Sequence, residues 1–307
     1  MLTTVPTPQT LQRSVIAVPP LARRADLSLA LEENRRLVTD LAAGNVNTLL
    51  YGGNANLYHI GVDEYPALLD MLEAIAGPDT WMIPSIGPEY GRMMAQARIL
   101  RDRDFPTAMV LPQTFPAMPE GIETGIRHAF AAFGKPLIAY VKNDGYLPPA
   151  TLGRLLEADA ICAVKYAVVR ENPADDDYLR AIIDAMGSDR VVSGIGERPA
   201  ITHWQSFGLR AYTSGSVCVA PTLSNRLRES LRAGDIAGAE RLRETFLPLE
   251  DQRDAISPIR VMHDAVTLAE IADMGPMLPL LSGLSDAQRQ DVGPAARALR
   301  RAEIDAR

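Results

Sequence analysis

The chain has 307 residues, which is long enough for one large domain or two small ones. Its 47% apolar and 22% charged residues are the balance of a globular protein in water, so a disordered or fibrous chain is excluded. The net charge is −7 and no segment concentrates basic residues, which argues against a nucleic-acid surface. No run approaches the roughly 18 consecutive apolar residues of a membrane span, so we expect no membrane association.

Residues 1–11 lack the basic and then apolar pattern of a signal peptide, and we expect a flexible tail there. Cys162 and Cys218 each lie in an apolar run, which predicts buried free thiols and a cytoplasmic protein. The four histidines are scattered, and none has a partner at ligand spacing. We therefore predict no metal site.

Eight short apolar runs recur along the chain, and their starts are roughly 20 to 33 residues apart. Most of them are continuously hydrophobic instead of alternating, as expected of parallel strands that are covered on both faces. The runs occupy residues 14–18, 47–51, 80–84, 107–111, 136–140, 160–165, 190–194 and 209–214. This spacing predicts repeated strand–helix units.

The segments between the runs carry helix signals. Residues 29–41 and 119–133 have apolar side chains at helical spacing and a glycine soon after the last of them. Asn172 and Pro173 have the properties of an N-cap and a first helical residue, which predicts a helix from there to Met186.

Eight units in this order predict a closed (β/α)8 TIM barrel of the α/β class. An open doubly wound sheet is the alternative, but its first strand is usually followed by a glycine-rich turn, and here two prolines follow it. From Pro221 onward the pattern changes to helices without strands. We therefore predict a flexible tail at 1–11, the barrel with its active site at 12–220, and a C-terminal appendage of about three helices at 221–307.

Catalytic groups of such barrels lie at the carboxyl ends of the strands. Lys165 closes the apolar run 160–165, and an ammonium group that faces a low-dielectric interior loses its proton more readily. The neutral amine is the form that attacks a ketone. Tyr140 closes the preceding run and could relay protons to a carbinolamine. The plainer alternatives are a lysine that reaches solvent or pairs with Asp144, and an ordinary rim tyrosine.

Three further stretches, together with Lys165 and Tyr140, carry a family resemblance. Residues 52–60 read GGNANLYHI, residues 140–144 read YVKND, and residues 212–221 read YTSGSVCVAP. In order and spacing these stretches resemble the dihydrodipicolinate synthase / N-acetylneuraminate lyase family of class I Schiff-base barrels, over nearly the whole chain. Within that family the chain is most similar to the 5-dehydro-4-deoxyglucarate dehydratase branch.

The resemblance implies roles for individual residues. Lys165 matches the Schiff-base lysine and Tyr140 the proton-relay tyrosine, while Gly53 and Asn54 match the loop that holds the keto-acid carboxylate. The family shapes its distal pocket at the ends of strands seven and eight, where this chain has Gly194, Ile195, Thr213 and Ser214. The resemblance also implies that no cofactor is needed, and that the protein is a homo-oligomer, either a dimer or a tetramer built from two dimers.

The chain departs from the synthases at several places. Their threonine pair is replaced by Gly53 and Asn54, and residues 112–114 stand where a tyrosine would reach into a partner subunit, so that relay is absent or altered. The arginine that binds a semialdehyde carboxylate falls at Gly145, so we do not expect dihydrodipicolinate synthesis. Lys142 lies on the same strand face as the relay tyrosine, which predicts a second carboxylate site or, alternatively, a solvated rim lysine.

Together these residues predict a lyase that acts on a small-molecule 2-keto acid. The favoured reaction is dehydration of a keto-deoxy sugar acid, in which Lys165 attacks C2, Tyr140 moves the protons and the iminium acidifies C3. Pyruvate-dependent retro-aldol cleavage is the alternative within the family. A non-catalytic ligand-binding barrel is the alternative from another class, and the glycine-containing turns after the last two strands leave a phosphorylated substrate open.

Overall fold

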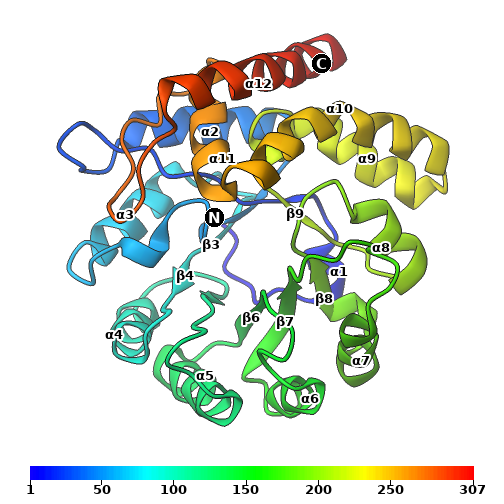
Figure 1. Ribbon diagram of the computed structural model, residues 1–307. Helices are drawn as coiled ribbons and strands as arrows, with labels where there is room; N and C mark the ends of the chain where they lie inside the picture. Colours follow the sequence, from blue (N-terminus) through cyan, green and yellow to red (C-terminus); the bar gives the residue numbers. More distant parts are fainter.

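The computed structural model describes all of residues 1–307 and contains a ring of parallel strands with helices outside it (Figure 1). Each of the eight predicted runs contains a strand. Pro84, which has no N–H to donate, divides the third strand position into two short strands. The strands are β1 (Ile16–Ala17), β2 (Thr48–Leu50), β3 (Trp81–Ile83), β4 (Ser85–Ile86), β5 (Met109–Val110), β6 (Leu137–Val141), β7 (Ile161–Tyr166), β8 (Val191–Ser193) and β9 (Thr213–Ser214).

The strand registers close the ring. One set has the order β3-β2-β1-β9 and the other the order β4-β5-β6-β7-β8, and all pairs are parallel. Ile16 of β1 pairs with Thr213 of β9, and a bridge between Ser193 and Tyr212 joins the two sets. On the other side the chain runs directly from β3 to β4. The predicted barrel is therefore confirmed, with eight strand positions.

Seven helices connect successive strands on the outside of the barrel (Figure 1). Their apolar faces pack against the strands, so the main core lies between the two layers. They are α2 (Leu31–Ala43), α3 (Tyr65–Ile75), α4 (Tyr90–Arg101), α5 (Pro119–Phe133), α6 (Pro149–Glu157), α7 (Asp177–Met186) and α8 (Ala200–Phe207), with short 3-10 turns η1 (Leu57–His59), η2 (Ser188–Arg190) and η3 (Ser216–Cys218).

Helix α7 begins later than predicted. Asn172 does not cap it but forms a local turn, in which its side chain accepts a hydrogen bond from the N–H of Ala174. The cap is Asp176, whose carboxylate accepts from the N–H of Leu179 and also from the hydroxyl of Tyr166. The bond to Tyr166 comes from tertiary packing, which the local capping pattern could not reveal.

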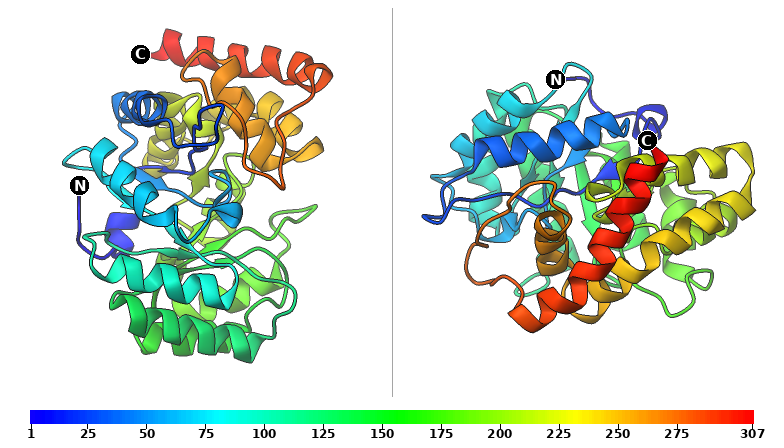
Figure 2. Two further views of the ribbon diagram at one scale, coloured as in Figure 1. Left: turned by 90° about the vertical axis from the view of Figure 1, so that its left-hand side faces the viewer. Right: turned by 90° about the horizontal axis from the view of Figure 1, so that it is seen from above.

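The two ends of the chain both pack on the barrel. The segment predicted as a tail forms a short helix, α1 (Pro8–Leu11), whose Leu11 is buried, and the N–H of Leu2 donates to the carbonyl of Thr80. After β9 the chain forms four helices, where about three were predicted. They are α9 (Pro221–Ala233), α10 (Ile236–Ala255), α11 (Pro258–Leu268) and α12 (Asp286–Ala306), and Figure 2 shows them gathered at one side of the barrel.

Helix α9 joins the two parts of the molecule. Its Leu227 and Leu231 pack into the barrel core, as the helix of an eighth strand–helix unit would, whereas Leu223 packs into a smaller core shared with α10, α11 and α12. The boundary predicted at residue 220 stays a prediction. None of the helices combines the length and the apolar character needed to cross a bilayer.

Candidate active site

A cavity of about 150 Å³ lies at the carboxyl ends of the strands, closed on one side by the helices α10 and α11. Its size suits a small metabolite better than a large organic cofactor. The structure brings eight of the nine sequence-predicted site residues to its wall. They are Gly53, Asn54, Tyr140, Lys142, Lys165, Gly194, Ile195 and Thr213.

Lys165 lies on β7 with only 5% of its surface exposed, and its side chain makes neither a hydrogen bond nor an ion pair. The alternative in which it pairs with Asp144 is wrong, because Asp144 forms its ion pair with Arg170 at 2.5 Å. Burial, followed by the nearby charge of Lys142, lowers the pKa of Lys165 to about 7. A substantial fraction of Lys165 is therefore a neutral amine at neutral pH.

Tyr140 on β6 is the direct neighbour of Lys165. The two residues are paired in register, and the Lys165 Nζ lies 4.5 Å from the centroid of the Tyr140 ring. Burial raises the pKa of Tyr140 to about 12, so its phenol keeps its proton at neutral pH and can donate it. Tyr58 also lines the cavity, and burial, with Tyr140 and Tyr146 nearby, raises the pKa of its phenol.

The loop after β2 offers free backbone donors. The N–H groups of Gly53 and Asn54 donate to no acceptor within the protein, although both residues line the cavity. The Asn54 side chain is already engaged, because its Nδ2 donates to the carbonyl oxygen of Val18 at 3.0 Å. The side chain therefore anchors the loop, and the two N–H groups remain available to an anion such as a carboxylate.

Ser214 is the one predicted site residue that lies away from the cavity. Its hydroxyl donates to Glu197 Oε2 at 2.8 Å and accepts from the N–H of Val217 at 2.9 Å. Successive residues of a strand face opposite sides, so Thr213 faces the cavity and Ser214 faces outward. The sequence prediction erred by placing both side chains in the same pocket.

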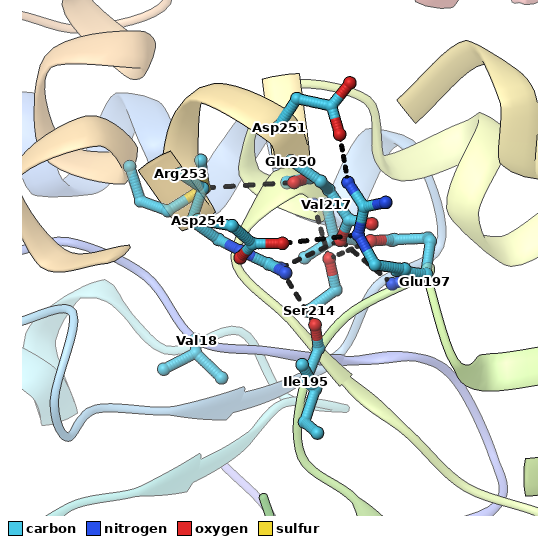
Figure 3. Close-up of polar contacts among 12 residues, drawn as sticks. Val18, Ile195, Glu197, Ser214, Val217, Glu250, Asp251, Arg253 and Asp254 are labelled. Carbon is cyan, nitrogen blue, oxygen red and sulfur yellow. Dashed lines mark hydrogen bonds and ion pairs between the residues drawn. The ribbon is translucent and has the colours of Figure 1, made fainter. Parts of the chain in front are cut away.

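The C-terminal helices contribute residues that sequence reasoning missed. Arg253 and Asp254, from the last turn of α10, line the cavity together with Pro258, Ile259 and Met262 at the start of α11. Figure 3 shows Arg253 and Asp254 beside Ile195, which follows β8. The residues after 220 had been assigned to an appendage, and nothing in their local pattern places them over the strand ends.

Other parts of the molecule do not gather reactive side chains around a cavity in this way. A larger groove of about 490 Å³ between α4 and α5 is mainly apolar and has no charged residue in its wall. No group of three or more His, Cys, Asp or Glu side chains is arranged to hold a metal ion. Cys162 and Cys218 are buried and free, as predicted.

No model of a known protein family matches the chain. Individual proteins do match it over most of its length. It is 25% identical over 288 residues to a probable 5-dehydro-4-deoxyglucarate dehydratase of Streptomyces coelicolor, covering 91% of this chain and 86% of the relative. It is 26% identical over 280 residues to a probable 5-dehydro-4-deoxyglucarate dehydratase of Rhizobium meliloti, covering 87% and 89%.

Solved structures share the architecture at lower identity. A sialic acid aldolase of Ruminococcus gnavus superposes with a TM-score of 0.84 at 15% identity, covering 97% of this chain and 100% of that one. A dihydrodipicolinate synthase of Bacillus clausii gives 0.83 at 18% identity, covering 95% and 99%. The resemblance predicted from the motifs is thus confirmed: the chain has the fold of the dihydrodipicolinate synthase / N-acetylneuraminate lyase family, and its curated relatives are named 5-dehydro-4-deoxyglucarate dehydratases.

Proposed function

We propose that the protein is a lyase in which Lys165 forms a Schiff base with a 2-keto acid. The observation that carries the proposal is a buried lysine without any acidic partner, facing a cavity beside a protonated phenol. A buried lysine of this kind costs stability, and neither a hydrogen bond nor an ion pair of its side chain offsets that cost. Its low pKa supplies the nucleophile that imine formation requires.

The steps follow from the groups around the cavity. The Lys165 amine adds to the C2 carbonyl and gives a carbinolamine. Tyr140 donates a proton to the carbinolamine hydroxyl, which leaves as water, and the iminium forms with the nitrogen lone pair. The N–H groups of Gly53 and Asn54 hold the C1 carboxylate. The iminium then acidifies C3, and the Tyr140 phenolate left by the first donation takes a C3 proton to give an enamine.

From the enamine we favour dehydration. The enamine electrons expel the C4 hydroxyl, which takes up the proton held by Tyr140 and departs as water. Water then hydrolyses the remaining iminium, with its proton returning to Tyr140, and releases the product and the Lys165 amine. The names of the curated relatives support this choice. Retro-aldol cleavage between C3 and C4 is the second candidate, and it is supported by the shared fold with a sialic acid aldolase. The two reactions differ in product, because only the cleavage releases free pyruvate.

Borohydride trapping with pyruvate tests the Schiff base. The chain has only three lysines, Lys135, Lys142 and Lys165, so peptide mass spectrometry can assign an adduct without ambiguity. We expect a reduced pyruvyl adduct on Lys165 in the wild type and in the controls Lys135→Arg and Lys142→Arg, and none in Lys165→Ala. No adduct with any 2-keto acid would contradict the proposal and favour a non-catalytic ligand-binding barrel.

Two wider predictions accompany the proposal. We propose that the protein acts in the cytoplasm, which suits its two free cysteines. We also propose that it is a homo-oligomer. Size-exclusion chromatography with light scattering would distinguish a monomer from a dimer or a tetramer.

A further inference from the structure

The turn that follows β2 aims its two free N–H groups through their own peptide units. A trans peptide holds its C=O and N–H in opposite directions, so a bond that fixes the carbonyl also fixes the N–H. The carbonyl of Gly52 accepts from the N–H of Leu57 at 3.2 Å, which directs the N–H of Gly53. The carbonyl of Gly53 accepts from the N–H of Asn56 at 2.8 Å, which directs the N–H of Asn54. Asn56 and its neighbour Leu57 therefore set the direction of both donors.

Asn56 combines a left-handed backbone with a side chain that bonds across the molecule. Its φ is +53°, a conformation in which glycine would be less strained. Glycine would lack the Nδ2 group, which donates to the carbonyl oxygen of Leu278 at 3.0 Å. Asn56 is only 5% exposed and does not line the cavity, so its side chain does not meet a ligand there. Its bond instead ties the turn to a segment 222 residues later in the chain.

The segment that this bond reaches is the connection between α11 and α12, residues 269–285, which we call the strap (orange in Figure 1). It contains neither helix nor strand, and a connection of this length without such structure is uncommon in a compact domain and usually functional. Side chains of α11 hold it in place. His263 Nε2 donates to the carbonyl oxygen of Gly275 at 2.9 Å, and Arg260 Nη2 donates to that of Gly283 at 2.7 Å. The strap is therefore fixed by the helix that also closes one side of the cavity.

We propose that Asn56 is a positioning residue, which holds the N–H groups of Gly53 and Asn54 at the substrate carboxylate by tying their turn to the strap. This inference rests on the proposed function, since it concerns the C1 carboxylate of a 2-keto acid bound by Lys165. Asn54 anchors the other side of the same turn through its bond to the carbonyl oxygen of Val18, directly after β1. A pair of donors that is fixed from two sides binds an anion without first losing conformational freedom.

The first experiment compares pyruvate with acetone, which has a methyl group in place of the carboxylate. Trapping on Lys165 by cyanoborohydride is followed in the wild type and in Asn56→Gly, which permits the left-handed backbone and removes the side chain. We expect half-maximal trapping of pyruvate to need about tenfold more ligand in the variant, while the trapping of acetone changes by less than about twofold. An equal change for the two ligands, or no change for pyruvate, would overturn the inference.

Asn45→Gly is the matched control. Asn45 has a φ of +60°, lies before β2 and has an exposed side chain, so the same substitution changes the backbone away from the turn. We expect this variant to trap both ligands as the wild type does, and a loss for pyruvate equal to that of Asn56→Gly would overturn the inference. A wild type that traps acetone as readily as pyruvate would also overturn it and leave the Schiff base standing. A wild type that traps neither ligand would overturn the proposed function itself.

A second experiment measures the same coupling at the strap. Reduction leaves a carboxyethyl group on Lys165 after pyruvate and an isopropyl group after acetone, so the two adducts differ only by a carboxylate in place of a methyl group. Coupling between two sites is reciprocal, so a carboxylate that the strap helps to hold must in turn stabilise the strap. We expect amide hydrogen exchange within residues 269–285 to be about threefold slower in the carboxyethyl protein, and the difference to vanish in Asn56→Gly. Equal exchange in the two wild-type adducts, or an unchanged difference in the variant, would overturn the inference.

Discussion

The two ends of the cavity are built in opposite ways. At the barrel wall, Lys165 and Tyr140 stand on buried strands with few polar partners, and their pKa values are shifted by burial. At the C-terminal helices, Arg253 and Glu250 are held by many hydrogen bonds and ion pairs. The first arrangement favours reactivity, because a group without partners keeps its lone pair or proton available. The second favours recognition, because a fixed donor selects the shape and charge of a ligand.

The largest effect is expected from Lys165→Met, which removes the nucleophile but keeps an unbranched side chain of similar length. We expect kcat with a keto-deoxy sugar acid to fall by roughly 10⁴-fold or more, since the only other amine at the cavity wall belongs to Lys142, which is exposed and lacks the burial of Lys165. Product formation measured under steady-state conditions gives this kcat. Lys135→Arg is the matched control and should retain wild-type activity, because Lys135 bonds to the carbonyl of Phe105 away from the cavity.

The same variant separates loss of chemistry from loss of fold. The pKa of Lys165 is lowered from 10.5 to about 7 in the folded protein, so folding must bury a group that the unfolded chain prefers to protonate. This penalty is fully present below pH 7 and disappears as the pH rises toward 10.5. Lys165→Met should therefore be more stable than the wild type in urea at pH 6, with a gain that shrinks at higher pH. A less stable variant at pH 6 would contradict the burial of an unpaired amine.

Tyr140→Phe should have the second largest effect. It keeps the ring against Lys165 but removes the hydroxyl that protonates the carbinolamine, and we expect kcat to fall by about 10²- to 10⁴-fold. Tyr58→Phe is the informative comparison, because Tyr58 lines the same cavity. A larger loss in Tyr58→Phe than in Tyr140→Phe would assign the relay to Tyr58. Single-turnover trapping rates with pyruvate would locate the affected step at imine formation.

The sequence predicted the barrel end of the cavity well, and the reasons are local. A continuous apolar run marks a buried parallel strand, and a lysine at the end of such a run is conspicuous. Tyr140 and Lys165 could be placed side by side because adjacent runs in a barrel pair in order. Neighbouring residues of a strand point to opposite faces, so an error of one position exchanges the two faces. For Thr213 and Ser214, the sequence did not identify which side chain enters the cavity.

The part of the cavity wall that the C-terminal helices form could not be predicted from the sequence, for a physical reason. Arg253 and Glu250 are three residues apart on α10, which locally reads as an ordinary helical ion pair on a surface. Their burial depends on Gly196 and Glu197, more than 50 residues earlier, and on how α10 packs across the strand ends. The predicted start of α7 was wrong for a related reason, since Asp176, which caps the helix, also bonds to Tyr166 on β7 through tertiary packing.

Gly196→Ala should disturb the recognition end and leave the reaction end intact. The added Cβ would meet Glu250 and Arg253, and alanine disfavours a φ of +95°. We expect kcat/KM for a keto-deoxy sugar acid to fall by about tenfold while pyruvate trapping on Lys165 is unchanged. Gly134→Ala is the matched control, because Gly134 has a φ of +84° but no atom within 4 Å of the added Cβ. Both variants should lose stability, and equal catalytic losses would show that backbone strain alone is responsible.

Lys142→Gln is expected to have the smallest effect, and it tests whether electrostatics couple Lys142 to the nucleophile. The charge of Lys142 is the second cause, after burial, of the lowered pKa of Lys165. Removing a like charge raises that pKa, so the amine fraction at pH 7 falls and kcat/KM falls with it, by about threefold. The loss should vanish above pH 9, where Lys165 is neutral in both proteins, and the acid limb of the pH profile should move upward from about 7. A pH-independent loss would instead mean that Lys142 contacts the substrate directly, because a lost contact weakens binding at every pH whereas a shifted pKa matters only where the amine titrates.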